Sequence, residues 1–418
     1  MLKSTLSSPI IPVSIFSMIV FLHLLIYFII GNCVFTNINS GMTLLIWILF
    51  IGISLRYKNN LWLGVPFALL FLNELIYINF NVDAFDGPSR TKLFYDITTT
   101  YFIKNEGKNT NLTEGLYLKD IHDNTSLMSE AESKQLSPEQ ASINKYKKFF
   151  MFLDMKPSEY KDLKILDLGC GNGDFIKHCK SLGIQASGMT ISKEQALFLQ
   201  QQNLDVYQGS YRELQPQFVG KYDIVTFWGS LEHTTQSYPC SKSGEEKADK
   251  VINYIMSHVK QYYRPETKYK LLFNTTLHMN RKICKNRLNT YLLERAYGGW
   301  YFYDEPNQTL SDKIVKGGFK KLKQDDYTYH YYMVTKIDPN HFGCPAEPNF
   351  YNMMSLFFGV LINPNLVAMS LYTLRGEWMW QFDNKSHLFD EPCKKCTFEH
   401  DRSKRPTTLL WSLNQVVD

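Results

Sequence analysis

The 418-residue sequence lacks a regular framework of cysteines, because its eight cysteines are scattered without a repeated spacing. This scatter excludes a small disulfide scaffold and is typical of a reducing compartment. The sequence also lacks a long basic tract, and its 45 Lys and Arg against 40 Asp and Glu leave a net charge of only +5. That charge balance does not indicate nucleic-acid binding, and it weakly favours a location beside an anionic surface. Internal repeats and low-complexity tracts are absent as well.

Long apolar runs do occur, and all three lie within residues 1–80. Ile10–Ile30 is long enough to cross a bilayer core of about 30 Å as a helix, and it exceeds the apolar region of a cleaved signal peptide. Met42–Leu55 is shorter, and Leu61–Phe80 contains an Asn-Glu pair that is costly in lipid. We therefore predict a membrane anchor of two transmembrane helices over this stretch, with three helices as the alternative.

The charges beside these runs predict which side of the membrane the main domain occupies. Lys3 precedes the first run, whereas Arg56 and Lys58 follow the second. Since basic residues favour the cytosolic side, both ends of a helical hairpin would face the cytosol. We predict an integral membrane protein whose main domain is cytosolic and whose neighbour is the lipid bilayer.

Strand and helix patterns alternate over residues 137–340, after a polar segment at 81–136. A first helix is predicted where Ser137 can cap and Pro138 takes the first helical position, with an apolar face of Ile143, Tyr146, Phe149, Phe150 and Leu153. Further helices are predicted at 174–181, 193–202, 251–262 and 312–315. The predicted strands are 164–168, 185–189, 205–208, 222–227, 269–274, 320–324 and 331–336. The alternation predicts an α/β fold with a doubly wound, mainly parallel sheet, and an aromatic-rich extension over 341–418 outside it.

A glycine-rich stretch joins the first predicted strand to the helix after it: Asp167-Leu168-Gly169-Cys170-Gly171-Asn172-Gly173. Glycines spaced by one residue let the backbone turn tightly and approach a bound ligand closely. The stretch lacks the basic residue and the Ser or Thr of a P-loop, which excludes the usual phosphate-binding form. We predict that a nucleotide-like cofactor is bound by Asp167, Gly169, Gly171 and Gly173, with an ordinary tight turn as the alternative.

The second strand lacks the acidic residue that commonly holds ribose hydroxyls at its end. In its place, the stretch Gly188-Met189-Thr190-Ile191-Ser192-Lys193-Glu194-Gln195 offers hydroxyl and amide groups, which can bond to a hydroxyl or an adenine edge. Ser192 and Gln195 also have the spacing of a helix capping box. Both roles are compatible, and we predict Thr190 and Gln195 as cofactor-binding residues.

These two stretches together resemble the cyclopropane-fatty-acid synthase and mycolic-acid cyclopropane synthase family of S-adenosylmethionine (SAM)-dependent methyltransferases. The Thr-x-Ser-x-x-Gln motif at residues 190–195 is the most specific part of this resemblance. Similar segments span about residues 90–340: Tyr95-Asp96, Gly209-Ser210-Tyr211-Arg212, Gly229-Ser230-Leu231-Glu232-His233 and His330-Tyr331. The resemblance implies a Rossmann-like, seven-stranded methyltransferase sheet and SAM as the cofactor, with Ser210 and Tyr211 beside it. It also implies that residues 81–136, here named the lead-in segment, lie over the active site.

The resemblance implies a catalytic site as well, in which the family holds a bicarbonate ion that removes a proton to close a cyclopropane ring. Glu232 and Tyr331 match two residues that hold this ion, and they are the predicted catalytic residues. The two other positions fall on Glu114 and Asn274. A carboxylate at such a site repels an anion. We therefore predict methyl transfer to a membrane lipid or fatty-acyl chain without ring closure.

Two other functions remain open from the sequence. One is an anchored methyltransferase that acts on the nitrogen or oxygen of a small molecule. The other is an inactive SAM-binding membrane scaffold, which would have no need to keep Glu232, Glu114 and the lead-in segment together. The sequence indicates no oligomeric state.

A possible zinc site near the C-terminus is the last motif to weigh. Cys393, Cys396 and His400 are closely spaced, but only Cys344 offers a fourth ligand. Because a structural zinc ion needs four ligands, we predict isolated thiols and no bound metal.

Overall fold

The computed structural model describes residues 51–57, 92, 95–96, 99, 113–234, 242–279, 302–337 and 407–417. Contacts divide the chain into two compact units, residues 1–85 with 349–372 and residues 86–348 with 373–418. Of the predicted anchor, residues 51–57 are described and are helical, and the rest of the predicted spans lies outside the described residues. Among the helices that are described, none is both long and apolar enough to cross a membrane.

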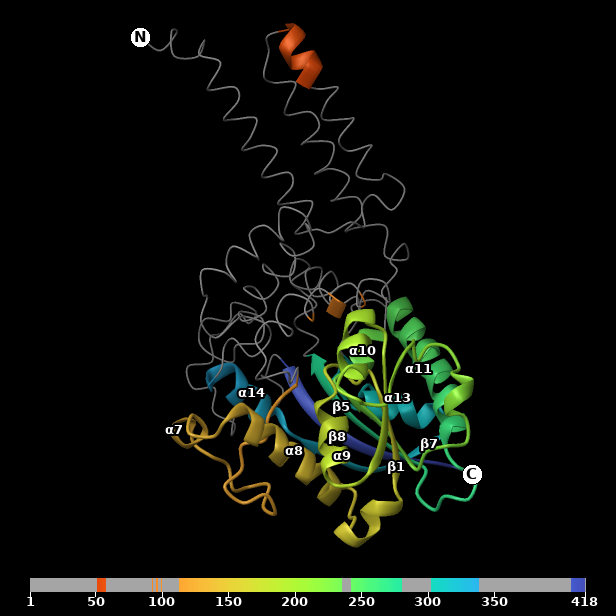
Figure 1. The fold of residues 1–418 in the computed structure, drawn as a ribbon. Coiled ribbons are helices and arrows are strands. Elements are labelled where there is room, and N and C mark those ends of the chain that lie inside the picture. Colours follow the sequence, from red (N-terminus) through yellow and green to blue (C-terminus); the bar gives the residue numbers. More distant parts are fainter. Residues whose placement is uncertain are drawn as a thin grey trace. The chain divides into compact units, whose positions relative to one another are not determined.

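The second unit is built on one mixed sheet (Figure 1). Its strands lie in the order β3-β2-β1-β4-β5-β8-β7, and a short strand β6 pairs with β5. Strands β1 to β5 run parallel, whereas β8 is antiparallel to both of its neighbours. The bounds are β1 Lys164–Leu168, β2 Gln185–Thr190, β3 Val206–Gln208, β4 Ile224–Trp228, β5 Leu271–Met279, β6 Phe302–Tyr303, β7 Phe319–Asp326 and β8 Thr407–Val416.

The first five predicted strands and the strand at 320–324 are all found, but the prediction is wrong at the far edge of the sheet. Residues 331–336 lie in helix α14 (Thr328–Ile337), which begins where Asp326 Oδ1 accepts a hydrogen bond from the backbone N–H of Thr328 at 2.9 Å. The strand between β5 and β7 is instead β8, from the extension for which the pattern predicts no strand. Residues 409–414 of β8 are buried, so the C-terminal end of the chain completes the core.

The helices predicted between residues 137 and 316 are present, with bounds α8 Pro138–Phe152, α9 Asp174–Ser181, α10 Lys193–Gln200, α11 Lys242–Tyr262 and α13 Leu310–Lys316. A short helix that was not predicted, α7 Glu130–Ser133, precedes them. Ser137 caps α8, because its Oγ accepts from the backbone N–H of Gln140 at 3.1 Å. One apolar position was placed wrongly, since Ile143 is 36% exposed. Two lysines of the same helix, Lys145 and Lys148, are buried instead.

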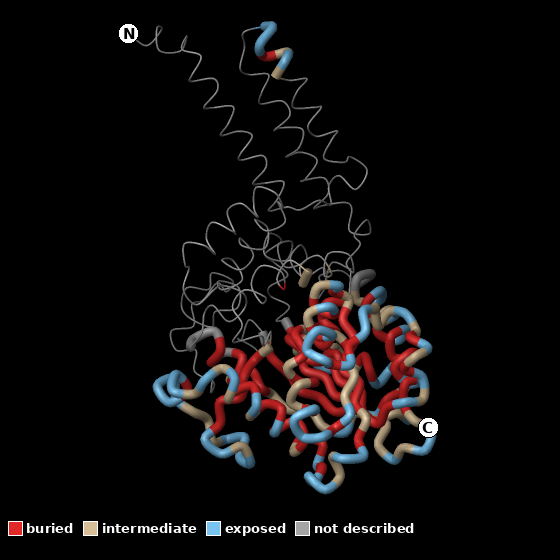
Figure 2. Tube along the Cα trace, in the orientation of Figure 1, coloured by how far each residue is buried: buried red, intermediate tan, exposed pale blue. Residues whose placement is uncertain are grey.

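Helices pack on both faces of the sheet and enclose its strands (Figures 1 and 2). One core cluster joins the strands to α11 and α13 and includes Leu166, Leu168, Val225, Phe227, Ile252, Met256, Leu310 and Ile314. A second cluster joins β3 to α9 and α10 and includes Cys170, Ile176, Ala196, Leu199, Leu204 and Val206. Strands buried on both faces are typical of parallel sheets covered by crossover helices.

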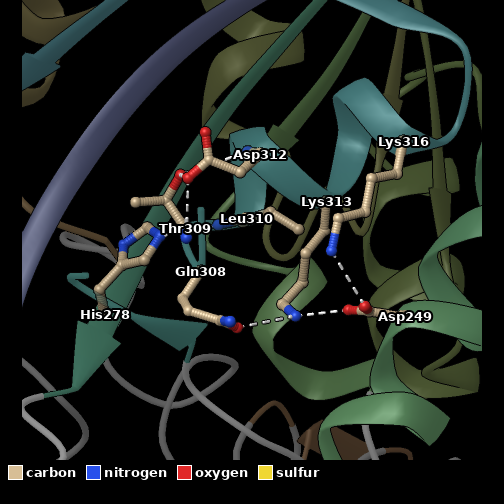
Figure 3. A network of polar contacts seen from close by, with 8 residues as sticks. All are labelled: Asp249, His278, Gln308, Thr309, Leu310, Asp312, Lys313 and Lys316. Carbon is tan, nitrogen blue, oxygen red and sulfur yellow. Dashed lines mark hydrogen bonds and ion pairs between the residues drawn. The ribbon is translucent and has the colours of Figure 1, made fainter. Parts of the chain in front are cut away.

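A polar network ties α13 to α11 and to the end of β5 (Figure 3). The backbone N–H of Leu310 donates to His278 Nε2 at 3.1 Å, and the Thr309 hydroxyl donates to Asp312 Oδ2 at 2.7 Å. The buried Lys313 and the exposed Lys316 both pair with Asp249 of α11. These contacts hold α13 against α11 and the carboxyl end of β5.

Candidate active site

A cleft lies where the carboxyl ends of β1, β2 and β4 meet, with about 930 Å³ of empty space that includes open solvent. This edge is where ligands bind in open α/β sheets. The cleft is lined by seven of the eight predicted cofactor residues: Asp167, Gly169, Gly171, Thr190, Gln195, Ser210 and Tyr211. The structure therefore brings together residues from three separate loops.

The eighth predicted cofactor residue, Gly173, does not line the cleft. It is the N-cap of α9 with a positive φ of 75°, and a Cβ there would lie 2.7 Å from Leu199 Cδ2 of α10. The small size of Gly173 thus serves helix packing, and its assignment to the cofactor site stays a prediction.

Asp167 lies at the bottom of the cleft and is almost fully buried. Its Oδ1 accepts a hydrogen bond from the Thr226 hydroxyl at 2.9 Å. Burial raises the pKa of Asp167 to about 7, although the hydrogen bond from Thr226 and the charge of Lys145 oppose the shift. Asp167 can therefore accept or share a proton with a polar ligand near neutral pH.

The side chains after β2 form a connected polar wall. The Thr190 hydroxyl donates to Gln195 Oε1 at 2.6 Å, and Gln195 Nε2 donates to Asn172 Oδ1 at 3.3 Å. Ser192 caps α10, because its Oγ accepts from the backbone N–H of Gln195 at 3.1 Å, as the capping-box spacing predicts. Thr190 and Gln195 thus line the cleft with oriented polar groups where other nucleotide-binding sheets carry an acid.

Ser210 and Tyr211 close the third side of the cleft. The Tyr211 hydroxyl donates to the backbone carbonyl of Ser230 at 2.8 Å, and the backbone N–H of Arg212 donates to Ser210 Oγ at 3.2 Å. Burial raises the pKa of the Tyr211 hydroxyl above its ordinary range, so it stays protonated. These contacts fix the loop after β3 against the end of β4.

The lead-in segment reaches this cleft through two adjacent residues. Tyr95 lines it, and its hydroxyl lies 3.0 Å from His233 Nε2. Asp96 Oδ1 accepts from the Ser192 hydroxyl at 2.6 Å and from the backbone N–H of Glu194 at 3.2 Å. The segment is therefore bonded to the ends of both β4 and β2.

Three aromatic side chains, Tyr146, Phe175 and Trp228, form one wall of the cleft. Trp228 lies at the end of β4, with its ring 5.4 Å from that of Tyr146 and 5.2 Å from that of Phe175. The helical pattern places Tyr146 on an apolar face, but it does not show that this face borders a cleft. Aromatic side chains of this kind suit an apolar ligand.

Glu232 lies in the short 3-10 helix Leu231–Thr234 directly after β4 and is only 6% exposed. It does not line the cleft, but a Cβ at Gly229, which does, would lie 3.5 Å from Glu232 Oε1. Glu232 Oε2 has no hydrogen-bond partner among the described residues. Burial, with a smaller contribution from the charge of Glu114, raises the pKa of Glu232 to about 8, although backbone hydrogen bonds at Glu232 and Leu277 oppose the shift.

Glu114 is buried behind the cleft wall, in the lead-in segment. Its Oε1 accepts a hydrogen bond from Trp411 Nε1 of β8 at 3.2 Å. The fully buried Lys145 of α8 donates to the hydroxyl of the neighbouring Thr113. Burial lowers the pKa of Lys145, and the opposing charge of Glu114 is the largest of those that raise it. Neither the role of Lys145 nor that of Trp411 is visible in the sequence pattern.

Asn274 and Tyr331 occupy different surroundings from those implied by the resemblance. Asn274 Oδ1 accepts from the Ser412 hydroxyl at 2.8 Å, so the side chain links β5 to β8. Tyr331 is buried in α14 and does not line the cleft. The catalytic role of Tyr331, which the resemblance implies, stays a prediction.

Within the part of the chain that the structure describes, no group of three or more His, Cys, Asp or Glu side chains could hold a metal ion. The zinc candidates Cys393, Cys396 and His400, with Cys344, lie outside the described residues.

Comparison with known proteins adds to this geometry. Residues 132–308 match a methyltransferase domain family. A segment of 114 residues is 31% identical to a "probable fatty acid methyltransferase" of Mycobacterium tuberculosis, over 25% of this chain and 25% of that protein. The chain thus spans about a quarter of the length of this curated relative.

Solved structures also align with the chain. A cyclopropane synthase from Mycobacterium tuberculosis aligns over 79% of this chain and 99% of its own, with 14% identity and a TM-score of 0.49. A coclaurine N-methyltransferase bound to N-methylheliamine and S-adenosylhomocysteine aligns over 77% and 78%, with 10% identity and a TM-score of 0.49. With TM-scores below 0.5, neither alignment carries an argument about the acceptor.

The matched domain and the cleft on the sheet edge define the class of domain. The chain carries a SAM-dependent methyltransferase domain, and SAM is its cofactor. The cleft's backbone turn at Gly171 and the polar wall of Thr190 and Gln195 fit such a cofactor. When bound, SAM supplies an electrophilic methyl group.

Proposed function

We propose that this enzyme belongs to the cyclopropane-synthase-like methyltransferases, and that it methylates a lipid or fatty-acyl acceptor without closing a ring. The proposal assigns SAM binding to the seven predicted residues that line the cleft. It assigns the handling of the acceptor's proton to Glu232, which lies against the cleft wall at Gly229.

One observation carries the proposal: Glu114 and Glu232, at two of the positions that the resemblance assigns to a bicarbonate site, are both buried carboxyl groups. A buried carboxylate makes a bound anion unfavourable. At the other altered position, the side-chain oxygen of Asn274 accepts a hydrogen bond from the Ser412 hydroxyl. Methyl transfer needs only the approach of the acceptor to the SAM methyl group, the exclusion of water and the removal of one proton. None of these requirements depends on a bound bicarbonate ion.

Three further features support a lipid acceptor. The curated relative is described as a probable fatty acid methyltransferase. The apolar runs within residues 1–80 would hold the cytosolic domain at a bilayer, which raises the local concentration of a substrate that lives there. The aromatic wall of Tyr146, Phe175 and Trp228 would shield an acyl chain from water.

Metabolic labelling tests the acceptor class. Cells that express the full chain are fed methionine with an isotope-labelled methyl group, and their lipid extract and aqueous extract are compared by mass spectrometry. We expect a labelled lipid that is absent from cells expressing a Gly171→Val variant. Label that depends on the enzyme but occurs only in water-soluble amines or ethers would overturn the lipid assignment and favour a small-molecule acceptor.

A further inference from the structure

One carboxylate outside the cleft is bonded to the segment that presents the polar wall: Asp96 of the lead-in segment. The second strand lacks the acid that nucleotide-binding sheets commonly carry at its carboxyl end. Asp96 reaches that place from 96 positions earlier in the chain, where it bonds to Ser192. The Asp96 side chain is 18% exposed and does not line the cleft, so it is not placed to touch a bound cofactor itself.

We propose that Asp96 is a positioning residue for SAM, which acts through Ser192 to hold the side chains of Thr190 and Gln195 in the orientation that binds the cofactor. The inference rests on the part of the proposed function that assigns Thr190 and Gln195 to SAM, and it does not depend on the identity of the acceptor. It makes the lead-in segment a contributor to cofactor affinity.

A continuous chain of hydrogen bonds leads from Asp96 to the cleft. The Ser192 hydroxyl donates to Asp96 Oδ1 at 2.6 Å and accepts from the backbone N–H of Gln195 at 3.1 Å. The backbone N–H of Ser192 donates to Thr190 Oγ1 at 3.2 Å, and the Thr190 hydroxyl donates to Gln195 Oε1 at 2.6 Å. Gln195 Nε2 donates in turn to Asn172 Oδ1 at 3.3 Å. Thr190, Gln195 and Asn172 all line the cleft, so the chain ends at the cofactor site.

Burial makes this chain sensitive to the loss of one partner. Thr190, Ser192 and Gln195 are each no more than 3% exposed. A buried polar group that loses its partner does not recover the hydrogen bond from water. Without Asp96, the proton of the Ser192 hydroxyl would need another acceptor, and serine hydroxyls near helix starts readily turn to backbone carbonyls. Such a turn would weaken the bond that Ser192 accepts from Gln195.

The start of helix α10 favours a carboxylate over a neutral side chain at this point. Asp96 Oδ1 also accepts from the backbone N–H of Glu194 at 3.2 Å, one of the first N–H groups of the helix, which have no partner within it. A negative charge beside a helix N-terminus is stabilised by the helix dipole. Hydrogen bonds to an ionised acceptor are also roughly twice as strong as those to a neutral one.

Contacts on both sides of Asp96 fix its carboxylate. Lys92 Nζ pairs with Asp96 Oδ2 at 2.7 Å, whereas Oδ1 faces Ser192. The hydroxyl of the neighbouring Tyr95 lies 3.0 Å from Nε2 of His233, in the segment that follows β4. Two adjacent residues are thus bonded to the segments after β2 and after β4, so the carboxylate is held in place before a cofactor binds.

Calorimetric titration of the full chain with S-adenosylhomocysteine tests this role without any acceptor. We expect Asp96→Ala to weaken binding about tenfold, the size typical of losing a hydrogen bond to a charged group. Asp96→Asn keeps an oxygen acceptor but loses the charge, so it should weaken binding about threefold. Asp205→Ala is the matched control and should leave the affinity unchanged. Asp205 also accepts from a serine hydroxyl, that of Ser187, but neither residue lines the cleft.

A double-mutant cycle with Ser192→Ala shows whether Asp96 acts through Ser192. Ser192→Ala should by itself weaken binding about tenfold, which keeps the test decisive if Asp96→Ala does not fold. Because both changes interrupt the same chain, the double variant should bind about as weakly as either single variant.

Losses that multiply to about a hundredfold in the double variant would overturn the proposal. So would unchanged affinity in folded Asp96→Ala or folded Ser192→Ala. Failure of the lipid-labelling experiment, with these affinities as expected, would instead reject the proposed acceptor and leave the role of Asp96 intact.

Discussion

Trp411 and Glu114 lie 297 positions apart in the chain, yet the indole N–H of Trp411 donates to Glu114 Oε1 at 3.2 Å. This bond joins the C-terminal strand β8 to the lead-in segment, behind the wall of the cleft. Trp411 also stacks on Tyr327, with ring centroids 4.0 Å apart. The last strand of the sheet therefore contributes to the surroundings of Glu114 as well as to the core.

The glycine loop provides a direct test of the cofactor site. Gly171→Val places a branched side chain at a cleft-lining position with a φ of +52°, so we expect SAM binding to be lost in calorimetry. Gly183→Val is the matched control, because Gly183 has a similar positive φ of 73° but no atom within 4 Å of an added Cβ. Full SAM affinity in a folded Gly171→Val protein would contradict the assignment of the cleft.

Replacement of Glu232 separates catalysis from cofactor binding. Glu232→Gln preserves the size of the side chain but removes its ionisable proton, so we expect turnover to fall about 100-fold, a typical contribution of acid–base catalysis. SAM affinity should be unchanged, because Glu232 does not line the cleft. Equal losses of turnover and SAM affinity would show that Glu232 supports the cofactor site instead.

The raised pKa of Glu232 also predicts how stability depends on pH. A carboxyl group with a pKa of 4.5 when unfolded and about 8 when folded binds its proton more tightly in the folded state. Its contribution is therefore greatest at low pH and is lost as the pH rises from 4.5 to 8. The wild type should lose up to about 1.4 kcal/mol per pH unit relative to Glu232→Gln in this window. Denaturant unfolding at several pH values measures the difference, and parallel curves would contradict it.

Removal of residues 1–80 tests the division of the chain. We expect the remaining fragment to be soluble and to bind SAM as the full chain does, because the sheet and the cleft belong to the second unit. Sedimentation and calorimetry measure the two properties. An insoluble fragment, or a fragment that does not bind SAM, would mean that the first 80 residues stabilise the domain.

Much of the sheet could be predicted because the pattern there is local. The strands from Lys164 to Asn274 and the helices between them follow apolar periodicity, and the cap at Ser192 follows from its spacing to Gln195. Strand β8 could not be predicted in the same way. It pairs with β5 across more than a hundred positions, and no local pattern records such a pairing. Residues 331–336 are rich in aromatic and β-branched side chains, which favour strands, but they fold as a helix.

The cofactor-binding stretches were visible in the sequence because they are continuous, whereas the acceptor site is assembled from distant segments. Lys145 lies on a helix whose apolar period marks other positions, and lysine is rarely buried. Its burial depends on Thr113 and Glu114, which belong to another segment. The altered positions Glu114 and Asn274 could be named from the resemblance, but their partners Trp411 and Ser412 could not.

The most direct test of the central claim, methyl transfer without ring closure, is to count deuterium atoms in the lipid product. Cells expressing the full chain are fed methionine whose methyl group carries three deuterium atoms, and the labelled lipid is analysed by mass spectrometry. A methyl group that is transferred and kept retains all three, which is the result we predict. A product that retains two deuterium atoms and has lost a double bond would be a cyclopropane, and it would contradict this account.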